Sequence, residues 1–182
     1  DQTRRQRQMC IRDRFKIELA KIHDLDRVKK IANDCALEMI SKGIFQWDEN
    51  YPNIEIFKKD IDNQNLYVYT EKSIVLGCIM LGLSKDEVYN NVDWLTKDEK
   101  NLYVHRLAVD PSHQKRGIGK LLMDFAEEYG LNNGLKSVRL DTFSKNNRNN
   151  KFYRSRNYIQ LDDVYFPNQS EFPFHCYEKI LN

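Results

Sequence analysis

The chain has 182 residues, of which 41% are hydrophobic and 31% are charged, and its formal net charge at pH 7 is +2. This length is typical of one domain that can bury a hydrophobic core, so no second domain is required. The longest apolar run, residues 74–83, is shorter than the roughly 20 residues that a membrane-spanning helix needs, and the near-balanced charge gives no argument for a nucleic-acid partner.

The N-terminal segment is set apart by its sequence. Residues 4–13, RRQRQMCIRD, resemble the translation of a transposase-type sequencing adapter, so we expect residues 1–14 to be non-native and exclude them from fold reasoning. The alternative is a natural basic arm that binds nucleic acid or acidic lipid. Without this segment the chain loses five basic and two acidic residues, and its formal net charge becomes −1. Residues 15–182 are then expected to form a single domain.

Cysteine usage in that domain argues against two kinds of site. Cys35, Cys78 and Cys176 remain after the segment is excluded, an odd number without CxxC spacing. Neither a disulfide framework nor a zinc site is therefore indicated, and we expect no metal. A reducing cytoplasm is the default location.

The first half of the domain predicts two helices and a hairpin. Residues 15–20 alternate as a strand does, and Asp24 is expected to cap a helix whose apolar residues recur at helical spacing until Gly43. Residues 46–52 form an aromatic, acidic loop, after which Asn53 begins a short helix. The runs 65–71 and 73–83 predict a β-hairpin, and the polar stretch 84–100 a surface excursion.

The second half predicts a parallel strand pair. Residues 101–110 form a strand, a glycine loop follows, and an apolar helical stripe from Ile118 to Tyr129 is expected to end at Gly130 or Gly134. Residues 137–142 form the next strand, 147–156 a short helix, and 158–165 and 174–181 two further strands. A strand–helix–strand unit beside antiparallel hairpins indicates an α+β fold with a mixed sheet.

The glycine loop QKRGIGK, residues 114–120, carries the main functional signal. Gly117 and Gly119 remove side chains where a backbone could approach a ligand, and Lys115, Arg116 and Lys120 add positive charge at a helix N-terminus. This combination indicates a phosphate group.

Other glycine loops fit less well. A Walker A loop needs Ser or Thr after Gly119-Lys120, but Leu121 stands there. A dinucleotide fingerprint needs a third glycine, but Leu122 occupies that position, although Asp141 lies where a ribose-binding acid would be expected. A glycine-rich turn without a ligand also remains open.

Residues 114–119 match the Q/R-x-x-G-x-G/A motif of the GNAT superfamily of acyl-CoA-dependent N-acyltransferases, directly after a strand ending LAVDP. Residues 139–158, RLDTFSKNNRNNKFYRSRNY, resemble a second family segment in which a strand is followed by Asn, a short helix and Phe-Tyr. Asn157 stands where the family usually has glycine, and asparagine tolerates the left-handed conformation best among the other residues. Tyr158 replaces the usual Phe. The resemblance covers essentially residues 15–181.

The resemblance implies a mostly antiparallel sheet flanked by helices, with a splay between its two central parallel strands. It implies that the end of the strand at Leu107, Ala108 and Val109 binds the pantetheine arm of acetyl-CoA, and that Asn146 contacts that arm. It also implies that the loop cradles the pyrophosphate. The residues of this cradle are Gln114, Lys115, Arg116, Gly117, Ile118, Gly119 and Lys120.

The resemblance further places Tyr153 near the CoA sulfur as the general acid; the alternative is an aromatic side chain packed in the core. His105 is either the base, directly or through a water, or a half-buried structural histidine. The substrate wall is expected to include Trp47, Asp48, Tyr51 and Arg106, because aromatic faces with carboxylates suit a cationic amine, although a solvated turn fits residues 46–52 equally well. Tyr165 and Phe166 would form the opposite wall.

The sequence therefore predicts an enzyme that transfers the acetyl group of acetyl-CoA directly to an amine. The acceptor is a small molecule or a peptide, without nucleic-acid or membrane partners, and a homodimer is left open. The alternative is a GNAT-fold module that binds CoA as a sensor or scaffold and has lost its chemistry. Intact Asn146 and Tyr153 favour the enzyme.

Overall fold

The computed structural model describes residues 15–182, and the predicted non-native segment 1–14 lies outside them. Seven strands form one sheet in the order β1-β2-β3-β4-β5-β7-β6. Every neighbouring pair is antiparallel except β4 and β5, which run parallel. The strands are β1 (Lys16–Leu19), β2 (Leu66–Glu71), β3 (Ile74–Gly82), β4 (Asn101–Val109), β5 (Ser137–Phe143), β6 (Ile159–Val164) and β7 (Phe174–Ile180).

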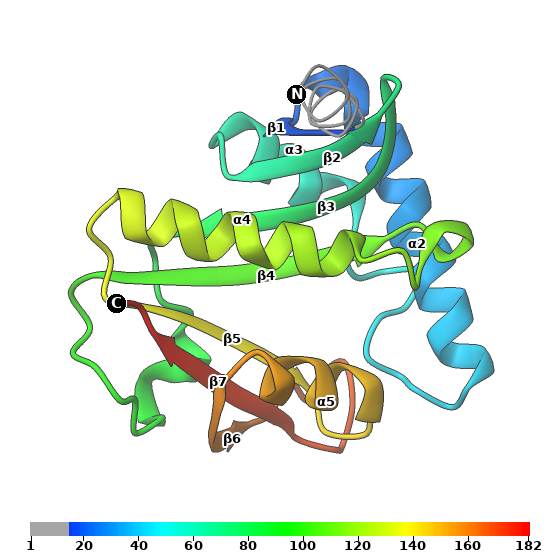
Figure 1. Cartoon of the computed structure of the whole chain (residues 1–182). Helices are drawn as coiled ribbons and strands as arrows, with labels where there is room; N and C mark the ends of the chain where they lie inside the picture. Colours follow the sequence, from blue (N-terminus) through cyan, green and yellow to red (C-terminus); the bar gives the residue numbers. More distant parts are fainter. Residues whose placement is uncertain (1–14) are drawn as a thin grey trace.

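Helices cover both faces of this sheet (Figure 1). Helices α4 (Ile118–Asn132) and α5 (Asn147–Ser155) pack on one face, whereas α2 (Leu25–Ser41) and α3 (Ile54–Asp62) pack on the opposite face over β2–β4. Three short 3₁₀ turns, η1 (Ile22–Asp24), η2 (Glu87–Asn91) and η3 (Pro111–His113), complete the fold. The mixed α+β fold predicted from the sequence is confirmed.

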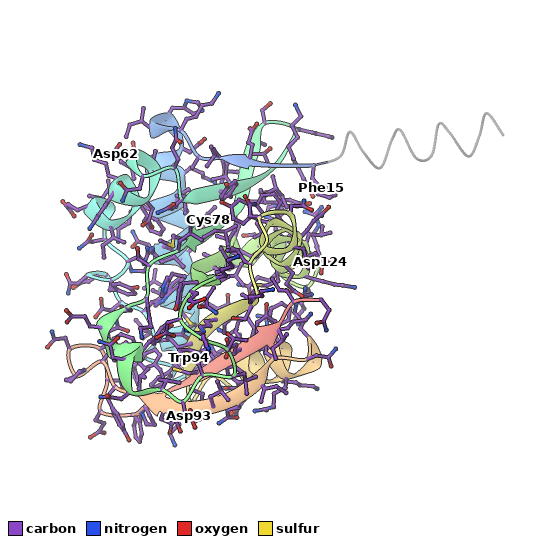
Figure 2. All side chains as sticks on the ribbon, turned by 90° about the vertical axis from the view of Figure 1, so that its left-hand side faces the viewer. Phe15, Asp62, Cys78, Asp93, Trp94 and Asp124 are labelled. Carbon is purple, nitrogen blue, oxygen red and sulfur yellow. The ribbon has the colours of Figure 1, made fainter. Side chains whose placement is uncertain are left out.

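Alternating side chains of the central strands build a core on each face. Leu102 and Leu140 pack beneath α4, while Cys78 and Ala108 pack beneath α2. Figure 2 shows Cys78 inside the molecule, whereas Asp62 and Asp124 lie at its surface. Since burial of apolar area is the main favourable term in folding, these two layers fix the positions of the central strands.

Local backbone signals in the sequence are confirmed in three places. Gly43 (φ +74°) follows the end of α2, Gly134 (φ +69°) rather than Gly130 follows the end of α4, and Asn157 (φ +69°) takes the left-handed conformation after α5. Asp24 differs from expectation. It occupies the N-cap position of α2, but its carboxylate accepts the Lys21 backbone N–H, at 2.8 Å, because η1 precedes the helix.

The two parallel strands separate along their length. The ladder of β4 and β5 pairs Asn101–Tyr103 with Ser137–Arg139 and ends there, although both strands continue. A β-bulge in β4 lies beyond this point, where Arg106 adopts φ +53°. The predicted splay is therefore present, and it leaves main-chain groups of residues 107–109 without a partner on β5.

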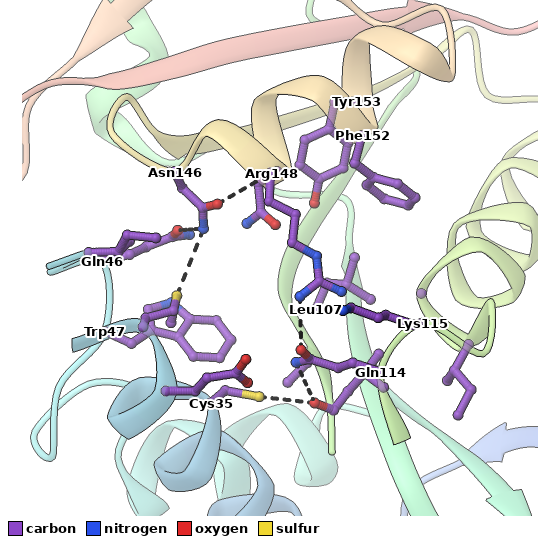
Figure 3. Close-up of a pocket in the computed structure, with 18 of the residues that line it drawn as sticks. Cys35, Gln46, Trp47, Leu107, Gln114, Lys115, Asn146, Arg148, Phe152 and Tyr153 are labelled. Atoms are coloured by element: carbon purple, nitrogen blue, oxygen red, sulfur yellow. Dashed lines mark hydrogen bonds between the residues drawn. The ribbon is translucent and has the colours of Figure 1, made fainter. Parts of the chain in front are cut away.

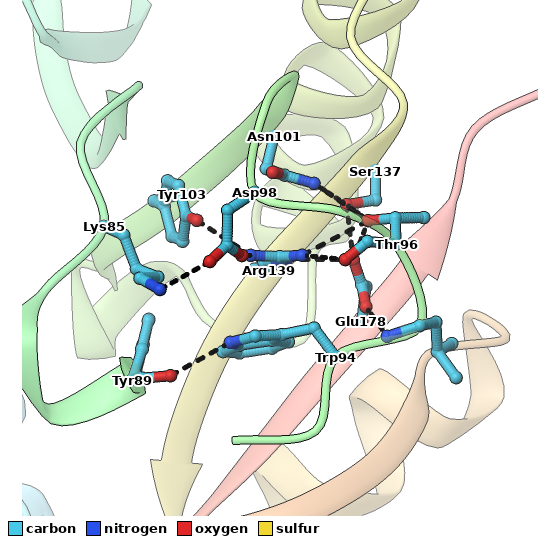
Figure 4. A network of polar contacts seen from close by, with 11 residues as sticks. Lys85, Tyr89, Trp94, Thr96, Asp98, Asn101, Tyr103, Ser137, Arg139 and Glu178 are labelled. Carbon is cyan, nitrogen blue, oxygen red and sulfur yellow. Dashed lines mark hydrogen bonds and ion pairs between the residues drawn. The ribbon is translucent and has the colours of Figure 1, made fainter. Parts of the chain in front are cut away.

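The polar segment 83–100 between β3 and β4 forms an excursion over the face opposite α5. Its Tyr89 is completely buried, as expected for an anchor. A second anchor is a network in which the Glu178 carboxylate accepts from the Leu95 N–H and from Arg139 Nε, at 2.5 and 2.9 Å (Figure 4). Among residues 15–182, no helix is long and apolar enough to cross a membrane.

Candidate active site

The glycine loop begins α4 with its backbone donors free. Gly117, the N-cap residue, has φ +81°, a conformation that favours glycine, and it makes no side-chain cap. Within residues 15–182, the N–H groups of residues 116–120 donate no hydrogen bond. Since the first amides of a helix need an external acceptor, this loop fits an anion such as a phosphate.

An ion pair holds the strand end that leads into this loop. Arg27 of α2 donates from Nη2 to Asp110 at 2.6 Å and from Nε to the Val75 carbonyl at 3.0 Å. Asp110 also accepts the Ser112 N–H at 2.9 Å. Burial opposes ionisation of Asp110, but these hydrogen bonds dominate and lower the pKa of its carboxyl group. The loop is thus fixed to α2 and β3.

A cavity of about 340 Å³ opens between the splayed strands, α2 and α5 (Figure 3). It unites the predicted pantetheine and pyrophosphate residues, with the exception of Arg116, whose side chain instead forms an ion pair with Glu71 at 2.8 Å. The predicted residues that line it are Leu107, Ala108, Val109, Gln114, Lys115, Gly117, Ile118, Gly119, Lys120, Asn146 and Tyr153.

Residues that were not predicted also shape this cavity. Arg148 of α5 donates to Gln114 at 2.8 Å, and Asn146 donates to Gln46 at 2.9 Å, so both contacts reach across the cavity (Figure 3). Cys35 donates its thiol to the Val109 carbonyl at 3.1 Å. Arg148 stands one residue after a predicted helix start, a position in which a basic side chain could have suggested an anion contact.

Tyr153 lies where this first cavity meets a second one. Its ring packs against Tyr158 and Tyr177, with centroids 5.7 and 5.9 Å away, and its hydroxyl points into the cavity (Figure 3). Burial, reinforced by the charge of Asp141, raises the pKa of Tyr153, so the phenol keeps its proton at neutral pH. Its ring is part of the core, and its protonated hydroxyl faces the cavity.

The second cavity, of about 330 Å³, lies on the face covered by the excursion. Trp47, Tyr51, His105 and Arg106, four of the residues predicted for the acceptor, line it, as does Phe166. The residues that line both cavities are Gln46, Trp47, Leu107, Asn149 and Tyr153. The two cavities therefore meet at the splay.

Two predicted wall residues lie elsewhere. Asp48 is exposed, and its carboxylate accepts the N–H groups of Asn50 and Tyr51 at 2.7 and 2.9 Å. The Asp48 side chain closes the turn and lines neither cavity. For Asp48, the alternative of a solvated turn is therefore the one that the structure shows. Tyr165 is 57% exposed and lines neither cavity.

Arg106 and His105 differ in how they are held. Asp60 pairs with the Arg106 guanidinium through two bonds of 2.6 and 2.8 Å, which stabilises the left-handed bulge. The His105 ring stacks on Tyr89 with centroids 6.3 Å apart. Burial and the charge of Arg106 lower the pKa of His105 to about 4, so His105 is neutral at pH 7 and a weak proton acceptor.

Asp141 of β5 is a cavity residue that sequence reasoning did not assign to the acceptor. It accepts a hydrogen bond from the Tyr89 hydroxyl, and it lines the second cavity. The pKa of Asp141 is raised to about 6, mainly because burial disfavours the charged carboxylate. The hydrogen bond from Tyr89 opposes this rise, and the nearby charge of Asp86 reinforces it. An acidic residue inside a predicted central strand, SVRLDT, was the available signal. Within residues 15–182, no cluster of His, Cys, Asp and Glu could hold a metal ion.

Comparison with solved structures shows the same fold in many proteins. The GNAT-family acetyltransferase of Streptococcus agalactiae aligns with a TM-score of 0.77 at 22% identity, covering 92% of this chain and 96% of that one. The N-acetyltransferase of Staphylococcus aureus gives 0.68 at 18% identity over 92% and 99% of the chains. The yncA protein of Salmonella typhimurium, solved with its cofactor acetyl-CoA, gives 0.66 at 16% identity over 92% and 94%.

The curated proteins include no match to this sequence. A family model described as the acetyltransferase (GNAT) family matches residues 25–158. The matched range includes Trp47 and Tyr153, which line both cavities. The chain therefore belongs to the GNAT acetyltransferase family.

Proposed function

We propose that this protein transfers the acetyl group of acetyl-CoA to the nitrogen of an amine. The observation that carries the proposal is the meeting of the two cavities at Tyr153. One cavity ends in the unbonded amides of the glycine loop, as a pyrophosphate requires, and the other is lined by aromatic and acidic groups, as a cationic amine requires.

The chain's own residues offer contacts for the pyrophosphate and for the pantetheine arm of acetyl-CoA. The N–H groups of residues 116–120 would hold the pyrophosphate, Lys115, Lys120 and Arg148 would add positive charge, and the open edge of β4 at residues 107–109 would bind the pantetheine arm. The bound cosubstrate would supply a thioester-activated acetyl group. The solved yncA structure of Salmonella typhimurium, with its acetyl-CoA, supports this choice of cofactor.

Two proton transfers are needed for this reaction. An alkylammonium with a reference pKa of about 10.4 has no lone pair for attack, so it must first lose a proton to a group in the acceptor cavity. The departing thiolate must gain a proton, and the Tyr153 hydroxyl, which stays protonated at neutral pH and lines both cavities, would donate it. The phenol is restored by the proton that the nitrogen loses when the amide forms.

The test is release of free thiol from acetyl-CoA in the presence of separate amines: n-butylamine, spermidine, L-lysine, kanamycin and a peptide with a free N-terminus. At least one amine should accelerate thiol release, with an N-acetylated product detected by mass spectrometry. Binding of acetyl-CoA without acetylation of any amine would favour the alternative, an inactive CoA-binding sensor or scaffold. We place the reaction in the cytoplasm, and a homodimer stays a prediction.

A further inference from the structure

The acceptor cavity contains a carboxylate that lacks a cationic partner. Asp141 is partly exposed in this cavity, and its Tyr89 hydrogen bond comes from a neutral group. Among residues 15–182, no Lys, Arg or His forms an ion pair with Asp141. An unpaired carboxylate in a largely buried position is costly, so this site favours a cation.

The cationic side chains that line the cavity already form ion pairs with other carboxylates. Arg106 is paired with Asp60 at 2.6 Å, and Lys85 with Asp98 at 2.6 Å. The charges of these two side chains are thus balanced within the protein. A positive charge for Asp141 must come from a ligand.

The other titratable groups around Asp141 do not neutralise it. Asp86, the N-cap residue of η2, and Tyr89 within η2 face it from the excursion. Tyr153 faces it from α5 and Cys176 from β7, while Tyr51 and His105 share the cavity. Burial raises the pKa values of the Tyr and Cys groups and lowers that of His105, so these side chains are neutral at pH 7. The remaining group, Asp86, is a second carboxylate and not a cation. The local charge is therefore negative.

Aromatic rings complete the surroundings of this charge. Trp47, Tyr51, Phe166 and Phe174 line the same cavity. Ring faces attract cations, and in a site with little water this attraction adds to that of a carboxylate. An ammonium group on an aliphatic chain fits both features.

We propose that Asp141 is the ammonium subsite of the acceptor cavity and accepts the first proton from the acceptor nitrogen, with Tyr89 as the residue that positions it. This inference rests on the proposed function and assigns its proton acceptor to a residue other than His105. The N–H bond of the ammonium breaks, its electron pair stays on nitrogen, and the proton joins an Asp141 oxygen. The carboxyl group later releases that proton to water.

The geometry explains why the excursion matters for this role. Tyr89 lies in η2, is completely buried, and reaches from the excursion to β5 with its hydroxyl. By donating to Asp141, the hydroxyl stabilises the ionised carboxylate and fixes one of its oxygens. The other oxygen is left for the ligand.

The first experiment measures the subsite without any reaction. The carboxyl pKa of Asp141 is followed by carbon-13 NMR in the CoA complex, with and without n-butylammonium chloride. Because a neighbouring cation favours the charged form, saturating n-butylammonium should lower this pKa by about 1 unit or more, and n-butanol should leave it unchanged. A pKa that does not respond to n-butylammonium would overturn the subsite.

The second experiment uses substitutions and the amine that releases thiol fastest in the panel above. Asp141→Asn should lower kcat/KM by about 10²- to 10⁴-fold, which is typical for loss of a general base, while the Kd of CoA is unchanged. Asp62→Asn, an exposed carboxylate on α3, is the matched control and should behave as wild type. Full kcat/KM in Asp141→Asn would overturn the proposal.

Tyr89→Phe keeps the buried ring and removes only the hydroxyl, so it tests the proposal even if Asp141→Asn does not fold. The acid limb of the kcat/KM profile should move to higher pH, because the hydrogen bond that lowers the Asp141 pKa is lost. An unmoved limb would contradict the positioning role of Tyr89. If n-butylammonium lowers the Asp141 pKa but no amine is acetylated, the subsite stands and the proposed function fails.

Discussion

At the scale of single residues, Gly119 is the position at which the cofactor cavity can be blocked most selectively. A Cβ added there would meet its nearest side-chain atom, Val109 Cγ2, at 3.9 Å, an ordinary contact distance. The backbone therefore has room for a side chain. Packing therefore does not require a glycine at this position, and we infer that a ligand's approach does.

We predict that Gly119→Glu abolishes acetyl-CoA binding and leaves the fold intact, because a carboxylate would stand beside the unbonded amides that a pyrophosphate needs. Isothermal titration calorimetry and the melting temperature measure the two effects. The matched control Gly119→Ala should retain most of the affinity. An unaltered Kd in Gly119→Glu would remove the loop from the cofactor site.

Some residue conformations were predictable, and others depend on distant parts of the chain. The left-handed conformation of Asn157 was predicted because asparagine tolerates it locally. Arg106 also has positive φ, but it is held there by Asp60, 46 residues away in the sequence. The positions of Asp48 and Asp141 could not be predicted from local sequence either. Only the folded chain places Asp141 in the cavity and leaves Asp48 on the surface.

At the scale of elements, a buried network joins the excursion to the sheet. Arg139 of β5 and Glu178 of β7 are register partners, both completely buried, and Glu178 also accepts from Thr96 and Ser137, each at 2.6 Å (Figure 4). Arg139 also pairs with Asp98 at 2.6 Å. The network thereby holds the excursion that carries Tyr89.

We predict that Glu178→Gln lowers the free energy of unfolding at pH 7 by about 3 kcal/mol, because the buried Arg139 guanidinium loses its buried carboxylate partner and keeps only Asp98, whose side chain is half exposed. Urea unfolding measures this change. The exposed Glu128→Gln on α4 is the matched control and should change little. Equal stability of Glu178→Gln and wild type would show that the network does not stabilise the fold.

The same pair has a defined pH dependence. Burial opposes ionisation of Glu178, but hydrogen bonds from Ser137, Thr96 and Arg139 lower the pKa of its carboxyl group below the ordinary value. Its stabilising effect is therefore present above the unfolded-state pKa of about 4.3 and is lost as the pH falls through the lower folded-state pKa. The stability difference between wild type and Glu178→Gln should shrink below pH 4 in urea unfolding. A difference that stays constant down to pH 2 would contradict this.

The order of strands and helices was predictable because each has a local pattern. The hairpin of β2 and β3 and the apolar stripe of α4 follow the expected residues closely. The network was not predictable, because Arg139 and Glu178 are 39 residues apart and meet only through the register of β5 and β7. Its trace in the sequence was a charged residue inside each of two predicted strands, Arg139 in residues 137–142 and Glu178 in residues 174–181.

At the scale of the whole molecule, the splay of β4 and β5 creates the site. It separates the strands beyond Tyr103 and Arg139, so that the two cavities meet between the faces of one sheet. The family resemblance predicted this splay and the residues of the cofactor cavity. The acceptor cavity could be predicted less completely, because η2 and the loop 46–52 come together only in the fold.

We predict that removing residues 1–14 changes neither the melting temperature nor the Kd of acetyl-CoA, because the sequence of this segment indicates a non-native origin. Differential scanning calorimetry and titration calorimetry of the shortened chain measure both. A melting temperature lower by several degrees would show that the segment is a natural part of the domain.

The most direct test of the central claim, that amine and thioester meet at Tyr153, is the single-turnover rate of acetyl transfer in Tyr153→Phe. Loss of the general acid should lower this rate by about 10²- to 10⁴-fold, while the Kd of acetyl-CoA is unchanged. Tyr158→Phe is the matched control, because its ring lies 5.7 Å from that of Tyr153 and lines neither cavity. A Tyr153→Phe protein that transfers the acetyl group at the wild-type rate would contradict the account.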